Sequence, residues 1–141
     1  MTPTQKRLVQ DTFAQVAPIS ETAAKLFYDR LFLLDPTLRP LFKGDMQEQG
    51  RKLTQMIAVA VGGLDDLDLL RSAIRALGRR HAGYGFQPAH YDTVATALLW
   101  TLEQGLGDAF TPEAREAWAT VYGILAGTML DGAAEPLART A

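Results

Sequence analysis

The stretch Ala24-Lys25-Leu26-Phe27-Tyr28-Asp29-Arg30-Leu31-Phe32 decides the fold class of this chain. Its apolar and aromatic side chains at positions 24, 27, 28, 31 and 32 follow an i, i+3, i+4, i+7, i+8 spacing. That spacing places them on one face of an α-helix and does not fit the alternation of a strand. We predict a helix that starts near Ser20 and ends before Pro36.

The same helical periodicity continues on both sides of this stretch, with no convincing strand pattern. Capping residues and prolines set the expected helix boundaries. Thr2 and Gln5 form an expected cap at one helix start, and at another Asp45 is the expected N-cap, with the side chain of Glu48 reaching back to it. The predicted helices are Pro3 to Ala17, a short turn over Pro36 to Leu41, a helix from Asp45 to Gly62-Gly63, one from Asp65 to about Gly83–Gly85, one from Pro88 and one from Thr111-Pro112. The sequence therefore predicts one all-α domain over residues 1–141, with roughly seven helices.

Composition narrows the function classes. The chain has 141 residues, 48% of them hydrophobic, with a formal net charge of −2 and no cysteine. Such a charge gives no electrostatic footprint for nucleic acid or an acidic membrane surface. The absence of cysteine excludes disulfides and thiolate metal sites. The N-terminus lacks the apolar run of a signal peptide, and no stretch reaches transmembrane length, so we expect a cytoplasmic protein with no membrane partner.

His81 stands near the end of a predicted helix, after Leu77-Gly78-Arg79-Arg80. A lone histidine is more often an ordinary hydrogen-bonded residue than a metal ligand. The chain has only two histidines and no pair at i, i+4 spacing, so its side chains cannot build a zinc site. A bound metal would have to arrive with most of its ligands, and haem is a group that needs only one from the protein.

Gln49 and Tyr28 are polar groups at apolar positions of their helices. Gln49 lies four residues before Leu53 on the apolar stripe, although polar residues are also common in a first turn. Tyr28 lies on the buried face of its helix, where its hydroxyl needs a partner. Both fit ordinary packing, and both fit hydrogen-bond donors directed into a cavity.

Several motifs together resemble bacterial haemoglobins and the globin part of flavohaemoglobins. They are Leu26 to Phe32 for helix B, Pro36 to Phe42 for the CD corner, Gln49-Gly50-Arg51-Lys52-Leu53 for helix E, Leu77 to His81 for helix F, His90-Tyr91 for helix G and Ala117-Trp118 to Gly123 for helix H. The resemblance covers essentially the whole chain in order. It implies a three-over-three globin fold with helices A, B, C, E, F, G and H and no separate D helix, and haem b (iron protoporphyrin IX) as cofactor.

The resemblance also implies roles for individual residues. His81 is the expected axial iron ligand through Nε2, with Nδ1 donating to the carbonyl of Leu77. Tyr28 and Gln49 are the expected donors to the gas ligand. The other residues expected to contact haem are Phe42, Lys52, Leu53, Arg80, Phe86 and Tyr91, with Lys52 and Arg80 favoured over Arg51 for the propionates. In flavohaemoglobins a glutamate joins the helix G tyrosine beside the histidine, but its position falls here on Ala133.

The resemblance implies O₂ binding on ferrous haem, stabilised by hydrogen bonds from the Tyr/Gln pair, with NO and CO as further gas ligands. An alternative is nitric oxide dioxygenase activity. The sequence holds no G-x-G-x-x-G nucleotide fingerprint, so this activity would need a separate reductase as partner. A weaker alternative is a six-coordinate globin for electron transfer or gas sensing. We expect a monomer or weak homodimer.

Overall fold

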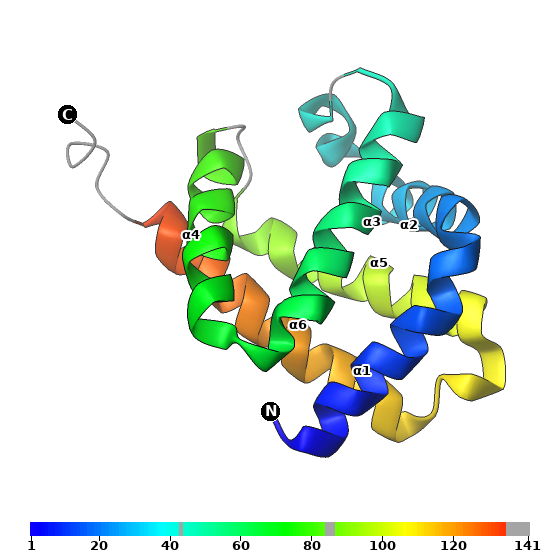
Figure 1. The fold of residues 1–141 in the computed structure, drawn as a ribbon. Helices are drawn as coiled ribbons and strands as arrows, with labels where there is room; N and C mark the ends of the chain where they lie inside the picture. The colour runs from blue at the N-terminus through cyan, green and yellow to red at the C-terminus, as the bar shows by residue number, and fades with distance from the viewer. Residues whose placement is uncertain (43, 84–86, 135–141) are drawn as a thin grey trace.

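The computed structural model describes residues 1–42, 44–83 and 87–134, and this part of the chain is helical with no strand. Six α-helices carry the fold: α1 Pro3–Val16, α2 Ser20–Leu34, α3 Met46–Gly62, α4 Leu67–Gly83, α5 Pro88–Leu106 and α6 Pro112–Ala133 (Figure 1). Four short 3₁₀ helices join them: η1 Ala17–Ile19, η2 Pro36–Leu41, η3 Gly63–Asp65 and η4 Gly107–Ala109. The expected all-α class is confirmed, and none of the described helices is long and apolar enough to cross a membrane.

The helix boundaries follow the predicted caps, with one correction. Thr2 and Gln5 form a reciprocal capping box, with hydrogen bonds of 3.0 and 3.1 Å. Asp45 accepts the amide of Gln47 at 3.0 Å and so caps α3 as expected. The expectation that Glu48 reaches back to Asp45 is wrong. Its carboxylate pairs with Arg51 at 3.5 Å, because the two side chains are neighbours at i, i+3 on the exposed face of the helix.

The helices pack in two groups that α1 and α5 connect. In one group α4 lies on α6; in the other α2 packs against both α3 and α5. Within the described residues α3 and α4 make at most scattered contacts with each other, and Figure 1 shows them apart, with α5 running behind α3. The described residues between η2 and α3, which are 42, 44 and 45, are not helical.

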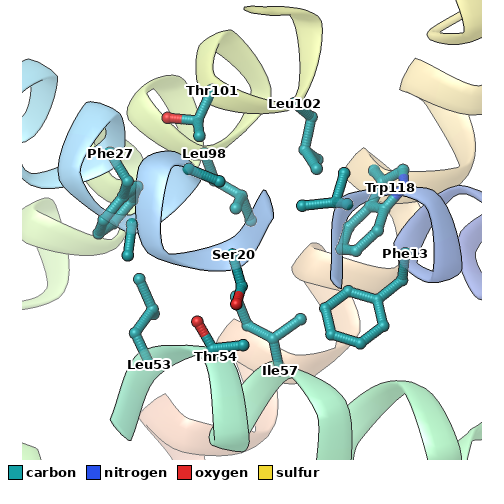
Figure 2. A pocket seen from close by; sticks show the side chains of 13 residues that line it. Phe13, Ser20, Phe27, Leu53, Thr54, Ile57, Leu98, Thr101, Leu102 and Trp118 are labelled. Carbon is teal, nitrogen blue, oxygen red and sulfur yellow. The ribbon is translucent and has the colours of Figure 1, made fainter. Parts of the chain in front are cut away.

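A small, partly open cavity of about 40 Å³ lies where α1, α2, α3, α5 and α6 meet, and Figure 2 shows the side chains that point into it. Its lining includes Phe27, Leu53 and Trp118. The lining threonines, Thr54 and Thr101, bond through their hydroxyls to carbonyls of their own helices at 3.0 and 2.8 Å. Those polar groups are therefore satisfied, and the cavity surface is mainly apolar.

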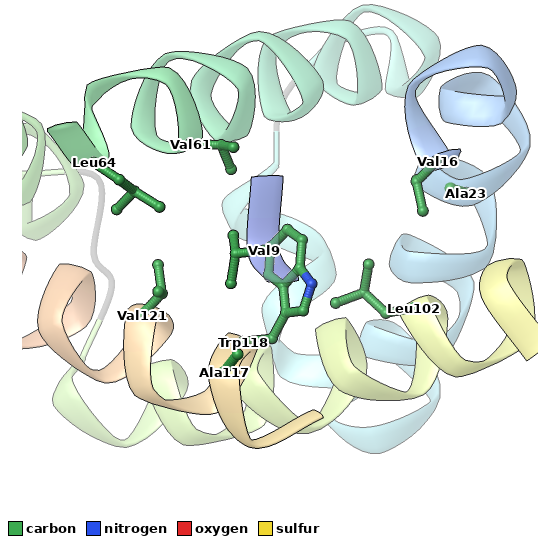
Figure 3. Packing of buried hydrophobic residues seen from close by; sticks show 9 residues of the cluster. All are labelled: Val9, Val16, Ala23, Val61, Leu64, Leu102, Ala117, Trp118 and Val121. Atoms are coloured by element: carbon green, nitrogen blue, oxygen red, sulfur yellow. The ribbon is translucent and has the colours of Figure 1, made fainter. Parts of the chain in front are cut away.

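The largest buried cluster surrounds Trp118 and holds α1, α3, α5 and α6 together (Figure 3). Val9 of α1 is fully buried, and Trp118 is 3% exposed. The indole Nε1 donates to the hydroxyl of Thr12 at 2.8 Å, so the buried polar edge of the ring has a partner. This cluster fixes the helices from which the candidate site is built.

Candidate haem site

His81 lies in the last turn of α4 and is half-buried. Its Nδ1 is 2.9 Å from the carbonyl oxygen of Leu77, which confirms the expected hydrogen bond one turn earlier. A carbonyl can only accept, so in this bond Nδ1 carries the proton and the lone pair of the neutral ring lies on Nε2. Burial lowers the pKa of His81 and outweighs the hydrogen bond to Leu77, which raises it; the charge of Arg80 lowers the pKa further. The neutral form is the one that can bind a metal.

Two tyrosines, Tyr91 of α5 and Tyr122 of α6, are joined by a hydrogen bond. The hydroxyl of Tyr122 donates to the backbone carbonyl of Tyr91 at 2.7 Å. Tyr91 is half-buried and packs against the cluster of α4 and α6 that includes Leu77. Ala133, at the position of the flavohaemoglobin glutamate, is the last residue of α6. No feature of the sequence predicted the bond between Tyr122 and Tyr91.

Tyr28 and Gln49 come from different helices and meet in the structure. The hydroxyl of Tyr28 is 3.4 Å from the backbone carbonyl oxygen of Gln49, and Tyr28 itself is 7% exposed. Burial raises the pKa of Tyr28 to about 12. The hydroxyl is therefore protonated across the physiological range and acts as a donor.

Aromatic rings surround Tyr28. Phe42 lies edge-to-face with Tyr28 at a centroid distance of 5.3 Å, and with Phe32 at 5.5 Å. Phe27 packs edge-to-face on the other side at 5.0 Å. These contacts fix the position of the Tyr28 ring, and they place the half-buried Phe42 against the same cluster. From its i+4 spacing to Tyr28, the sequence predicted Phe32 only as a packing residue on the same face of the helix.

Two apolar clusters face different parts of α5. Val94 and Leu98 pack with the cluster of α2, η2 and α3, whereas Tyr91 packs with the cluster of α4 and α6. Each cluster includes apolar side chains that remain only partly buried, among them Phe42 and Leu53 in the first and Leu77 in the second. Incompletely covered apolar groups on two helix pairs that do not pack on each other are suited to hold a flat apolar group between them.

The remaining predicted residues fall in three groups. Lys52, Arg51 and Arg80 are exposed, and Arg51 pairs with Glu48. Phe86 lies outside the described residues. His90, the second histidine, accepts the backbone amide of Gln87 through Nδ1 at 2.9 Å and so helps to cap α5.

Comparisons with known proteins agree with this arrangement. The globin family model matches residues 25–129. The chain is 34% identical over 127 residues to the flavohemoprotein of Xylella fastidiosa (strain Temecula1 / ATCC 700964), an alignment that covers 88% of this chain and 32% of that protein. It thus spans about a third of the length of the flavohemoproteins it matches. It is also 32% identical to neuroglobin of Danio rerio, over 90% of this chain and 89% of that protein.

A solved structure shows the same fold at low sequence identity. The hexacoordinated heme protein from an anhydrobiotic tardigrade, at pH 4, superposes with a TM-score of 0.87 at 20% identity, over 96% of both chains. The family match extends over most of the present chain, and the neuroglobin alignment covers nearly all of both proteins. The chain belongs to the globin family.

Proposed function

We propose that this globin binds haem b with His81 as the axial iron ligand and serves mainly to bind O₂. The observation that carries the proposal is the hydrogen bond from His81 Nδ1 to the carbonyl of Leu77, at 2.9 Å. It fixes the ring orientation and directs the lone pair of the neutral imidazole to Nε2. Haem, when bound, supplies an iron with one coordination position for a diatomic gas.

Apolar side chains on both helix groups support haem as the bound group. Phe42 and Leu53 on one side and Leu77 on the other are apolar and only partly buried, so a porphyrin would remove their remaining apolar surface from water. Lys52 and Arg80 are exposed cations on α3 and α4. We propose that they bind the two propionates.

Tyr28 and Gln49 support O₂ as the gas ligand. The Tyr28 hydroxyl is buried, protonated and next to the backbone of Gln49. A gas ligand that gained negative charge on the iron would accept hydrogen bonds from the Tyr28 hydroxyl and the Gln49 amide N–H. A hydrogen bond to a charged partner contributes about 1.5–3 kcal/mol, which is roughly ten- to a hundredfold in affinity.

The small cavity beside Leu53 fits a small apolar ligand better than water. Its volume of about 40 Å³ exceeds what one water needs, but its lining is mainly apolar. Phe27 and Leu53 both line the cavity. Phe27 also belongs to the cluster around Tyr28, and Leu53 packs against that cluster. This supports a diatomic gas as the molecule that the protein handles.

The direct test is His81→Gly, with His90→Gly as the matched control. We expect His81→Gly to lose haem on purification, and added haem with imidazole to restore a ferrous absorption spectrum like that of the wild type. His90→Gly should keep its haem, because His90 helps to cap α5 and is not the proposed iron ligand. A His81→Gly protein that purifies with full haem and an unchanged Soret band would contradict the assignment.

Nitric oxide dioxygenase activity is the second candidate, favoured by the 34% identity to a flavohemoprotein over 88% of this chain. The chain spans only about a third of that protein, and sustained turnover of this activity needs a reductase as its electron source. NO consumption by the O₂-loaded protein, with and without an added reductase and reduced nicotinamide cofactor, separates the two functions. Sustained consumption with the reductase would favour the enzyme, whereas a single turnover in both cases would favour the binding protein.

A further inference from the structure

Two glycines mark the closest approach between α4 and α6. A Cβ added at Gly78 would overlap the carbonyl group of Met129, with its carbon 2.6 Å away. A Cβ added at Gly132 would overlap the carbonyl group of Arg75, with its carbon 2.7 Å away. Gly78 thus lies against Met129, which is three residues before Gly132, and Gly132 lies against Arg75, which is three residues before Gly78. Both contacts are with the backbone of the opposite helix. A backbone neighbour cannot move aside as a flexible side chain can.

This crossing is adjacent in sequence to the groups that hold His81. Gly78 follows Leu77, whose carbonyl accepts the His81 hydrogen bond, and precedes His81 by three residues. The same helical turn therefore contacts the backbone of α6 on one side and orients the imidazole on the other. Gly78 and Gly132 are both buried at this contact.

In the described part of the chain α4 packs mainly on α6. It also contacts η3, which precedes it in the chain, and makes at most scattered contacts with α3 and α5. An extra atom at the crossing would therefore displace α4 from α6 with little resistance from the opposite side. Such a displacement would carry Leu77 and His81 with it.

From this geometry we infer that Gly78 and Gly132 are positioning residues for His81: their backbone-to-backbone crossing sets where the imidazole meets the haem iron. The inference rests on the proposed function, because it concerns the residue proposed to bind iron. The glycines act through α4 and do not contact the group themselves.

Four variants test the inference. Gly78→Ala and Gly132→Ala add the Cβ at the crossing. Gly127→Ala is the matched control on α6, since a Cβ there meets no described atom within 4 Å. Gly50→Ala is the control for a helix crossing elsewhere, since its Cβ would meet only the Cβ of Ala24, at 3.0 Å.

The decisive measurement is the iron–histidine stretching band of the ferrous haem protein by resonance Raman spectroscopy. We expect the band to shift or broaden in Gly78→Ala and Gly132→Ala and to stay unchanged in both controls. Haem dissociation should be about 5- to 150-fold faster in the first pair, the range that corresponds to overpacking a tight contact. An unchanged band in both crossing variants would overturn the inference.

Two further readouts separate this inference from its alternatives. Should the crossing variants not fold, hydrogen exchange in the wild-type protein without haem decides: we expect the amide of Gly78, at the crossing, to exchange far more slowly than the amides in the first turn of α4. Fast exchange at Gly78 would overturn the inference. If the wild-type protein lacks the iron–histidine band, or His81→Gly retains it, the proposed function itself fails. If the band depends on His81 but not on the glycines, only the positioning role fails.

Discussion

The crossing of α4 with α6 and the crossing of α2 with α3 position the two sides of the candidate site in different ways. At the first, Gly78 and Gly132 bring backbone against backbone. At the second, Gly50 faces the Cβ of Ala24, and the aromatic rings around Tyr28 fill the adjoining space. We call the first region, α4 and α6, the proximal wall, and the second, α2, η2 and α3, the distal wall.

The difference concerns what each wall can tolerate. The proximal wall is set by main-chain atoms, whose positions follow from the helices themselves. The distal wall is set by side chains, namely Phe27, Tyr28, Phe32 and Phe42, whose rings pack at centroid distances between 5.0 and 5.9 Å. Substitutions in the distal wall should therefore change ligand and haem retention in graded steps without moving the helices.

The largest graded effect is expected for Phe42→Ala. Truncation of a fully buried phenylalanine costs about 3–5 kcal/mol. Phe42 is partly buried without haem, and a bound porphyrin would cover it further. We expect haem dissociation to an acceptor globin to become at least about tenfold faster. Phe110→Ala is the control, because Phe110 packs against the Trp118 cluster and is not part of the cluster around Tyr28 and Phe42. Equal acceleration in both variants would show that Phe42 has no special contact with haem.

A smaller effect is expected for the exposed cations. Lys52→Gln and Arg80→Gln should each speed haem dissociation by less than about fivefold, because exposed ion pairs contribute about 0.2–1 kcal/mol. Arg51→Gln should have no effect, since Arg51 pairs with Glu48 at 3.5 Å. A larger effect of Arg51→Gln than of Lys52→Gln would reverse the assignment of the propionate contacts on α3.

The smallest effect concerns pH. The pKa of Tyr28 is raised from 10.0 to about 12, so the protonated donor persists well above its ordinary range. We expect the rate of O₂ release to stay flat between pH 7 and pH 10. A tyrosine with an ordinary pKa would be half ionised at pH 10, and the lost donor would speed release. A rise centred near pH 10 in the wild type, absent from Tyr28→Phe, would contradict the burial of this hydroxyl.

The sequence was enough to predict the helices and the local geometry of His81. Periodicity and caps are local features, so the boundaries at Thr2, Asp45 and Gly62 and the bond from His81 to Leu77 could be predicted without tertiary contacts. The Glu48 prediction failed because two local pairings competed, and the pairing with Arg51 prevailed.

Contacts between distant segments could not be predicted in the same way. The approach of Gly78 to Met129 and of Gly132 to Arg75 depends on how α4 and α6 cross. A glycine inside a helix looks unfavourable from sequence alone, and only the crossing explains it. The bond from Tyr122 to Tyr91 likewise joins residues 31 positions apart, and no spacing rule identifies it.

O₂ release from the distal-wall variants tests the central claim most directly. Tyr28→Phe and Gln49→Leu each remove one donor and keep the approximate shape of the side chain. If both donate to O₂, each should speed release into dithionite by about ten- to a hundredfold, measured by stopped flow, and the double variant should approach an apolar site. The effects need not add, since one donor can compensate for the other. Release rates within about twofold of the wild type in all three variants, less than ~0.4 kcal/mol, would contradict a distal wall that stabilises O₂.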